Sequence, residues 1–125
     1  MSLDFSASSQ DAATNLLYID HAKGLAYCMD DEDFYKEILD VFCDQYAEDF
    51  PNLEAAFQAK DWKRYAGLAH GFKGNTLNIG AVNVSALCLE HELAGKADDG
   101  AFIESHFEDY AATMKALVEK VKGML

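Results

Sequence analysis

Basic residues are scarce in this sequence. Ten lysines and arginines stand against 22 aspartates and glutamates in 125 residues, which gives a formal net charge of -12 at pH 7. A nucleic-acid interface needs clustered lysine and arginine, and an anionic membrane surface attracts the same residues. The charge balance therefore argues against nucleic acid and membranes as partners, whereas a basic protein surface stays compatible with it.

Proline, cysteine and long apolar runs are also rare. One proline and few β-branched runs argue against a β-sandwich or barrel. Cys28, Cys43 and Cys88 are widely spaced, so we interpret them as small buried residues in a reducing cytosol rather than as a disulfide framework. No apolar run approaches the roughly 20 residues that cross a bilayer, and no signal peptide is evident. We therefore expect a cytoplasmic protein.

Apolar residues at helical spacing are abundant. Half of the chain is apolar, which is enough for one buried core. The spacing predicts four long helices over residues 31–60, 62–79, 84–94 and 98–122, and short ones over 10–18 and 20–29. The fold expected is all-α, an antiparallel up-and-down four-helix bundle with one or two short extra N-terminal helices. Residues 1–10 are expected to form a flexible segment and residues 11–125 the bundle domain.

Single residues mark where these helices should begin, bend or end. Pro51 should kink or split the first long helix. Asp61 is the expected N-cap of the next helix, and Gly80 is its expected left-handed C-terminal cap. Asn83 can cap the following helix, with Gly95 just past its end. The last helix should begin at Asp98 or Asp99.

Glycines surround one histidine in the second long helix. Gly67, Gly71 and Gly74 lie within four residues of His70, although each glycine inside a helix costs roughly 1 kcal/mol relative to alanine. Close packing between helices is one explanation, but these glycines lie off the apolar stripe. We interpret them as bare backbone around the imidazole, which another protein can approach closely.

The residue types around His70 suit reversible phosphorylation. Imidazole is largely an unprotonated nucleophile near neutral pH. Lys73, one turn away, favours that neutral form and would attract an anion that collects on the ring nitrogen. The ordinary alternative is a surface histidine without any role.

The segment from His70 to Gly80, HGFKGNTLNIG, resembles the signature of the histidine phosphotransfer (Hpt) domain family of multistep phosphorelays. That signature is a histidine, two residues, lysine, glycine, two small residues, two further residues, an aliphatic residue and a glycine. Asn75 and Thr76 depart mildly from the usual small residues. The likeness covers residues 18–122, so it implies a helical bundle for most of the chain.

The resemblance implies a function and partners. His70 would accept a phosphoryl group on Nε2 from a receiver-domain aspartyl phosphate and pass it to an aspartate of another response-regulator receiver. The partners implied are receivers of response regulators and of a hybrid sensor histidine kinase. Mg²⁺ would come from the receiver, so no cofactor of its own is expected, and the chain should be a monomer. The alternative is a helical-bundle interaction module without phosphotransfer activity.

The chain is expected to be a phosphocarrier rather than an enzyme. It carries no P-loop and no glycine-rich kinase signature, so ATP-dependent kinase activity is not expected. Its start at Met1 slightly favours a free-standing protein over a fragment of a hybrid kinase.

Further site residues are expected from the same resemblance. Lys73 would stabilise charge at the phosphorylated ring. Family members often place a polar side chain on the next helix to hold the histidine Nδ1, and Glu92 is the best match by its spacing from His70, with Glu90 second. Both carboxylates are equally compatible with ordinary solvated positions on a helix.

The receiver-binding surface is expected to be partly apolar. Phe34, Tyr35 and Ile38 could contribute exposed parts, although most of these suit the core as well. Lys36 and Lys73 would set the electrostatic fit. On the helix that carries the histidine, the expected partner-binding residues are Gly67, Gly71, Gly74 and Leu77.

The remaining histidines and cysteines predict no second site. Cys88 and His91 are three residues apart, but no matching ligand pair exists elsewhere, so no metal site is expected. His21 and His106 are interpreted as surface or seam residues. Cys43 and Cys88 lack the exposed basic setting of a nucleophile.

Overall fold

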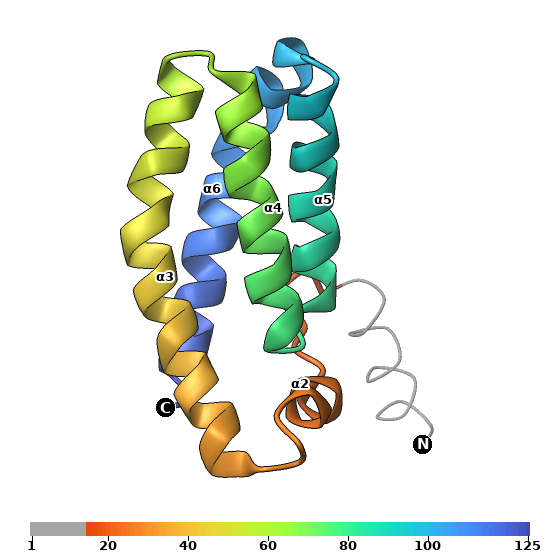
Figure 1. Cartoon of the computed structure of the whole chain (residues 1–125), viewed down its shortest axis with the longest axis vertical. Helices are drawn as coiled ribbons and strands as arrows, with labels where there is room; N and C mark the ends of the chain where they lie inside the picture. The colour runs from red at the N-terminus through yellow and green to blue at the C-terminus, as the bar shows by residue number, and fades with distance from the viewer. Residues whose placement is uncertain (1–14) are drawn as a thin grey trace, which may run out of the picture.

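The computed structural model describes residues 15–125, which form helices joined by short turns (Figure 1). In chain order these are α2 (His21–Tyr27), α3 (Glu32–Gln58), α4 (Trp62–Asn78), α5 (Val82–Lys96) and α6 (Gly100–Lys122). The four long helices, α3 to α6, run alternately up and down, and α2 lies at the end of the bundle where α3 begins. This arrangement confirms the predicted antiparallel four-helix bundle with a short helix ahead of it.

Aspartate side chains cap four of these helices. Each accepts a hydrogen bond from a backbone N–H in the first turn: Asp20 in α2, Asp31 in α3, Asp61 in α4 and Asp99 in α6. Such a cap satisfies an amide that has no partner within the helix and contributes about 1 kcal/mol. The starts of α4 and α6 are therefore where the sequence predicts them.

The turn between α4 and α5 depends on Gly80. Its φ is +87°, a left-handed conformation that glycine adopts without a side-chain clash. A Cβ at this position would collide with the carbonyl oxygen of Asp20, whose own N–H donates to the Gly80 carbonyl over 2.8 Å. Gly80 thus ends α4 as predicted and also lets the start of α2 pack against the turn.

Two predicted boundaries of α5 are wrong. The helix begins at Val82 after Ala81, so Asn83 lies inside the first turn, where its Nδ2 donates to the Asn15 carbonyl over 2.9 Å. Gly95 lies inside the helix rather than past its end, and it is buried. A Cβ on Gly95 would lie 2.8 Å from the Trp62 carbonyl oxygen. The glycine is therefore a point of close packing between α5 and α4.

Pro51 does not split α3, which runs through it without a break. Proline lacks an N–H, so the carbonyl of Ala47, one turn earlier, loses its helical partner. Pro51 and Ala47 are both exposed, which leaves that carbonyl open to water, while Phe50 and Leu53 on the opposite side are buried. Burial of the inner face thus keeps the helix continuous.

The N-terminal predictions are only partly within the described residues. Residues 1–10, predicted as a flexible segment, lie outside them, and so does most of the helix predicted over 10–18. Its last residues form a turn, because Asn15 Oδ1 accepts from the Leu17 N–H and the Asn15 carbonyl accepts from the Tyr18 N–H. An asparagine side chain that binds the backbone in this way competes with a helix.

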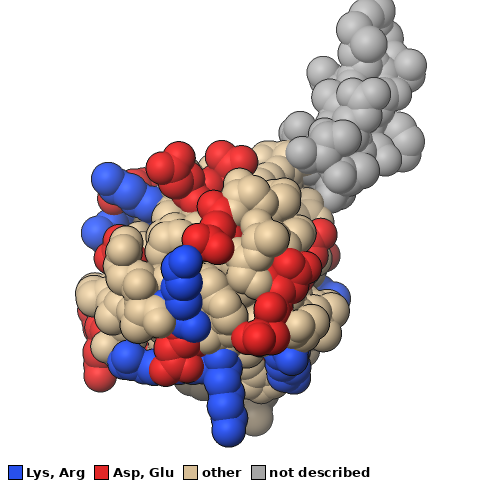
Figure 2. All heavy atoms as spheres, turned by 90° about the horizontal axis from the view of Figure 1, so that it is seen from above, with Lys and Arg blue, Asp and Glu red and all other residues tan. Residues whose placement is uncertain are grey.

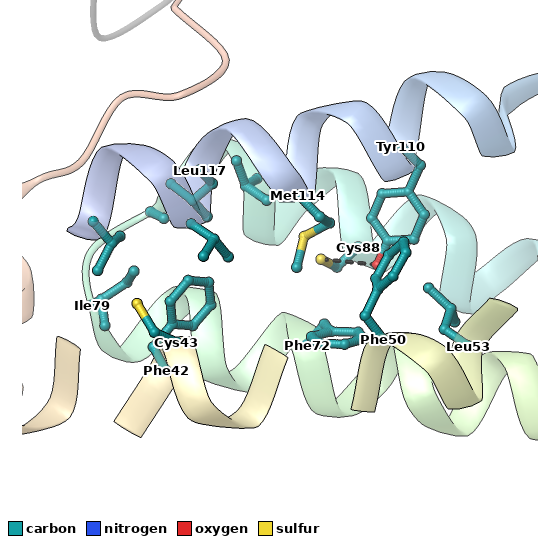
Figure 3. Close-up of a cluster of buried hydrophobic side chains, with 14 of the residues drawn as sticks. Phe42, Cys43, Phe50, Leu53, Phe72, Ile79, Cys88, Tyr110, Met114 and Leu117 are labelled. Carbon is teal, nitrogen blue, oxygen red and sulfur yellow. Dashed lines mark hydrogen bonds between the residues drawn. The ribbon is translucent and has the colours of Figure 1, made fainter. Parts of the chain in front are cut away.

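The core fills the space between the four long helices (Figure 3). Phe42 and Leu53 of α3, Phe72 of α4, and Met114 and Leu117 of α6 are at most 3% exposed. Tyr65, Ala69, Phe72 and Thr76 form the buried face of α4, and Ile79 just after the helix is buried as well, as their spacing predicts. Trp62, predicted on the same face, is half-buried. This face fixes the rotation of α4, and with it the side chains that α4 presents to solvent.

The three cysteines are free thiols and all are buried, as predicted. Burial raises the pKa of the Cys88 thiol to about 11, and the Tyr110 hydroxyl donates to its Sγ over 3.2 Å. A buried thiol with a raised pKa is a poor nucleophile. This agrees with the expectation that Cys88 packs in the core.

His91 is a buried polar residue of this core. Its ring is fully buried, stacks on Tyr110 with 4.0 Å between centroids, and shares a 2.8 Å hydrogen bond between Nδ1 and the Tyr65 hydroxyl. Its Nε2 has no hydrogen-bond partner among residues 15–125. Burial lowers the pKa of His91 from 6.5 to about 4, so the ring is neutral in the folded protein at pH 7.

The free energy of unfolding should therefore depend on pH through His91. Between pH 6.5 and about 4 the unfolded chain binds a proton that the folded protein does not, so stability falls as the pH is lowered. The loss should reach roughly 3 kcal/mol. Urea unfolding of wild type and His91→Gln from pH 7.5 to pH 4 measures it. We expect the free energy of unfolding of the wild type to approach that of His91→Gln as the pH falls from 6.5 to 4. A difference that stays constant with pH would contradict a lowered pKa of His91 in the folded protein.

Candidate functional site

His70 lies in the middle of α4, one residue past the buried Ala69, and its side chain is 65% exposed. The buried face of α4 turns it to the edge of the helix, as the sequence predicts. The bulk of the ring is therefore open to an approaching molecule.

The backbone around this ring is bare. A Cβ built on Gly67, Gly71 or Gly74 meets no atom of another element within 4 Å among residues 15–125, so all three positions face open space in that part of the chain. Close packing between helices does not explain these glycines, in contrast to Gly95. A partner surface can therefore approach the α4 backbone on both sides of His70 without displacing a side chain.

Glu92 of α5 reaches His70 from below the surface. Its side chain is 2% exposed. Its Oε2 lies 3.0 Å from His70 Nδ1 and 2.8 Å from Lys96 Nζ, and its Oε1 lies 2.8 Å from Lys73 Nζ. One buried carboxylate thus bridges an imidazole and two ammonium groups. Glu92, the preferred partner by sequence spacing, is the carboxylate that the structure places beside Nδ1, whereas Glu90 lies exposed on α5.

The charge of Glu92 fixes the proton on the imidazole. Hydrogen bonds from Lys73 first, then from Lys96 and His70, lower the pKa of Glu92 from 4.5 to about 2, although burial opposes the change. An ionised carboxylate has no proton to donate, so the 3.0 Å contact requires an Nδ1–H on the ring. In a neutral imidazole this leaves the lone pair on Nε2. The arrangement therefore presents a nucleophilic nitrogen on an exposed ring.

Lys96 is a member of this site that the sequence reasoning missed. The helix was expected to end near Ala94, which placed Lys96 beyond it. In the structure α5 runs to Lys96, so Lys96 lies one turn after Glu92 on the same face. The spacing of four residues between Glu92 and Lys96, which is typical of ion pairs on one helix face, could have predicted this contact.

Two hydroxyl groups stabilise α4 next to its glycines. Thr76 Oγ1 donates to the carbonyls of Phe72 and Lys73 over 2.8 and 3.0 Å, and Ser85 of α5 donates to the Lys73 carbonyl over 2.9 Å. Glycine weakens a helix because the unfolded chain gains more freedom there. The Ser85 bond holds the turn that carries Lys73 against α5.

A groove of about 660 Å³ lies beside His70, between α4 and α5. Its lining consists of Lys63, Ala66, Gly67, His70, Glu92, Gly95, Lys96 and Asp98. Figure 2 views the bundle end-on, and lysines and arginines lie among acidic side chains there, despite the net negative charge of the chain. The lining of the groove therefore combines small residues without polar side chains and charged residues of both signs.

The expected docking residues have different positions. Leu77 is half-buried on α4, and Lys36 is exposed on α3. Phe34 is 40% exposed and lines a small hollow with Ile38. Tyr35 belongs to the core instead, because it is 2% exposed and its hydroxyl donates to the Ile79 carbonyl over 2.8 Å.

The other histidines lie apart from this site. His21 is exposed and its Nε2 lies 3.0 Å from Glu32 Oε1, while His106 is exposed on α6. Within residues 15–125, no group of three or more His, Cys, Asp or Glu side chains is arranged to hold a metal ion. No helix in this part of the chain is long and apolar enough to cross a membrane.

The family follows from comparison with known proteins. The Hpt domain model matches residues 37–123, and the chain belongs to the Hpt domain family. Domains of this family are phosphocarriers of phosphorelays that interact with receiver domains and lack kinase activity of their own. The comparisons with curated proteins and with solved structures gave no match.

Two glycine substitutions should have opposite effects on stability. Gly74→Ala adds a methyl group in open space on a helix, so it should raise the free energy of unfolding by at most ~1 kcal/mol. Gly95→Ala forces a methyl group against the Trp62 carbonyl and should lower the free energy of unfolding by about 1–3 kcal/mol. Urea titrations of both variants measure the difference. A destabilising Gly74→Ala would show that this glycine serves packing.

Proposed function

We propose that this chain carries a phosphoryl group on Nε2 of His70, taken from a receiver-domain aspartyl phosphate and passed to an aspartate of a second receiver. One observation carries the proposal: the buried Glu92 carboxylate lies 3.0 Å from Nδ1 of an exposed imidazole. An ionised carboxylate makes this contact only with an Nδ1–H, which leaves the lone pair on Nε2. Membership of the Hpt domain family supports the same chemistry.

In the transfer, the Nε2 lone pair attacks the phosphorus of the aspartyl phosphate. The bond between phosphorus and the aspartate oxygen breaks, and the carboxylate leaves with the bonding electrons. The ring becomes an imidazolium, and its Nδ1–H stays bonded to the Glu92 carboxylate. Lys73 would stabilise the charge of the transferred group. Transfer to the second receiver reverses these steps.

The receiver would supply what this chain lacks. Phosphoryl transfer depends mainly on positioning and on neutralising charge, so a domain that offers a held nucleophile is sufficient when its partner brings Mg²⁺. Gly67, Gly71 and Gly74 would let the receiver close over His70, and the half-buried Leu77 would add apolar contact. The partners proposed are receivers of response regulators and of a hybrid sensor kinase, met in the cytoplasm by a monomer.

Replacing the histidine should abolish transfer. Wild type incubated with a phosphorylated receiver and Mg²⁺ should take up acid-labile, base-stable label, and His70→Gln should take up none. His106→Gln removes another exposed histidine and serves as the matched control, which should be labelled like wild type. Label on His70→Gln would contradict the assignment. A receiver that binds without transferring label would favour the interaction module.

Replacing Glu92 should slow transfer without unfolding the protein. In Glu92→Ala no side chain accepts from Nδ1–H, and loss of such an orienting partner slows transfer by about tenfold or more. Glu90→Ala removes an exposed carboxylate two residues away and should transfer at the wild-type rate. Single-turnover rates, with circular dichroism as the folding check, make the comparison. Equal rates for Glu92→Ala and wild type would remove the role of Glu92.

A further inference from the structure

Lys96 and His70 share one oxygen atom. Lys96 Nζ lies 2.8 Å and His70 Nδ1 lies 3.0 Å from the same Oε2 of Glu92, while Lys73 occupies Oε1. The carboxylate is 2% exposed, so bulk water competes weakly for it. Two positively polarised donors at one oxygen share its negative charge and repel each other, so each weakens the interaction of the other with that oxygen.

We propose that Lys96 is a positioning residue for phosphoryl transfer: by sharing Glu92 Oε2, its ammonium weakens the hold of the carboxylate on the Nδ1 proton of His70 and so sets the pH range in which the phosphohistidine reacts. This inference rests on the proposed function of His70. It assigns Lys96 no contact with the phosphoryl group.

The Nδ1 proton decides how readily the phosphohistidine breaks down. With Nδ1 protonated, water attacks the phosphorus, the P–Nε2 bond breaks, and its electron pair returns to Nε2. A neutral imidazole then leaves, and inorganic phosphate is released. Without that proton the leaving group is an imidazolate anion, which departs far less readily. The rate of hydrolysis therefore falls with rising pH as Nδ1 loses its proton.

The other charged groups near the His70 ring include a suitable control residue for Lys96. The charged or titratable groups that face His70 are Lys63 and Lys73 of α4, Glu92 and Lys96 of α5, and Asp98 just after α5. Lys63 lines the same groove as Lys96, yet the structure records no ion pair between it and Glu92. Lys63 therefore provides a control for the loss of one positive charge from the groove.

The geometry of α5 supports a specific role for Lys96. Gly95 lets the last turn of α5 pack closely on α4, since a Cβ there would lie 2.8 Å from the Trp62 carbonyl oxygen. Lys96 also stands in the last turn of α5, where the helix dipole favours a cation. Its ammonium is thus held on the Glu92 side of the groove.

The test measures phosphohistidine decay against pH. Full-length wild type, Lys96→Met, Lys96→Arg and Lys63→Met are loaded with phosphoramidate, and decay is followed by the ³¹P signal that His70→Gln lacks. Removing Lys96 should strengthen the hold on the Nδ1 proton, so the midpoint of the pH profile should rise by about half a pH unit. At a pH above the midpoint, where the decay rate falls with rising pH, the phosphohistidine of Lys96→Met should therefore decay about threefold faster than that of the wild type. Lys96→Arg should restore the wild-type midpoint, and Lys63→Met should leave it unchanged.

Three outcomes would overturn the inference. They are an unchanged or lowered midpoint in Lys96→Met, an equal rise in Lys63→Met, and failure of Lys96→Arg to restore the profile. A wild type that carries phosphohistidine from phosphoramidate but takes no label from a phosphorylated receiver with Mg²⁺ contradicts the proposed function alone. A wild type that phosphoramidate does not label at His70 contradicts both.

Discussion

The buried carboxylate of Glu92 is the group on which the site depends. The Glu92 side chain is 2% exposed and lies within 3.0 Å of charged or polar nitrogens of His70, Lys73 and Lys96, whose side chains are 65%, 29% and 63% exposed respectively. An isolated buried charge would be costly, and the two ammonium groups offset that cost. An ionised carboxylate at this position would orient the imidazole and select its tautomer. The site thus joins α4 to α5 while it leaves most of the imidazole ring at the surface.

The glycines around His70 exchange helix stability for access. Gly67, Gly71 and Gly74 face open space among the described residues, so no packing there offsets their cost to helix stability. The opposite face of α4 supplies the stability instead, through its buried aromatic residues and the hydroxyl bonds of Thr76 and Ser85. A helix that is firmly packed on one side can be bare on the other.

Much of the fold and part of the site could be predicted from the sequence, because both depend on local spacing. Apolar residues at helical spacing predicted the four long helices, and the spacing from His70 favoured Glu92 over Glu90 as its partner. The end of α5 could not be predicted, because Gly95 reads as a helix stop unless the nearby Trp62 carbonyl is known. That error placed Lys96 outside the helix and hid its pairing. Tyr35 was also ambiguous, since its burial depends on contact with Ile79 across the bundle.

The tautomer of His70 is the most direct test of this account. In ¹⁵N-labelled protein at a pH where the ring is neutral, ¹H–¹⁵N correlation through the ring carbons shows which nitrogen carries the proton. The hydrogen bond to Glu92 predicts a protonated Nδ1 and an unprotonated Nε2. A proton on Nε2 would contradict it, because the nitrogen proposed to attack phosphorus would have no free lone pair.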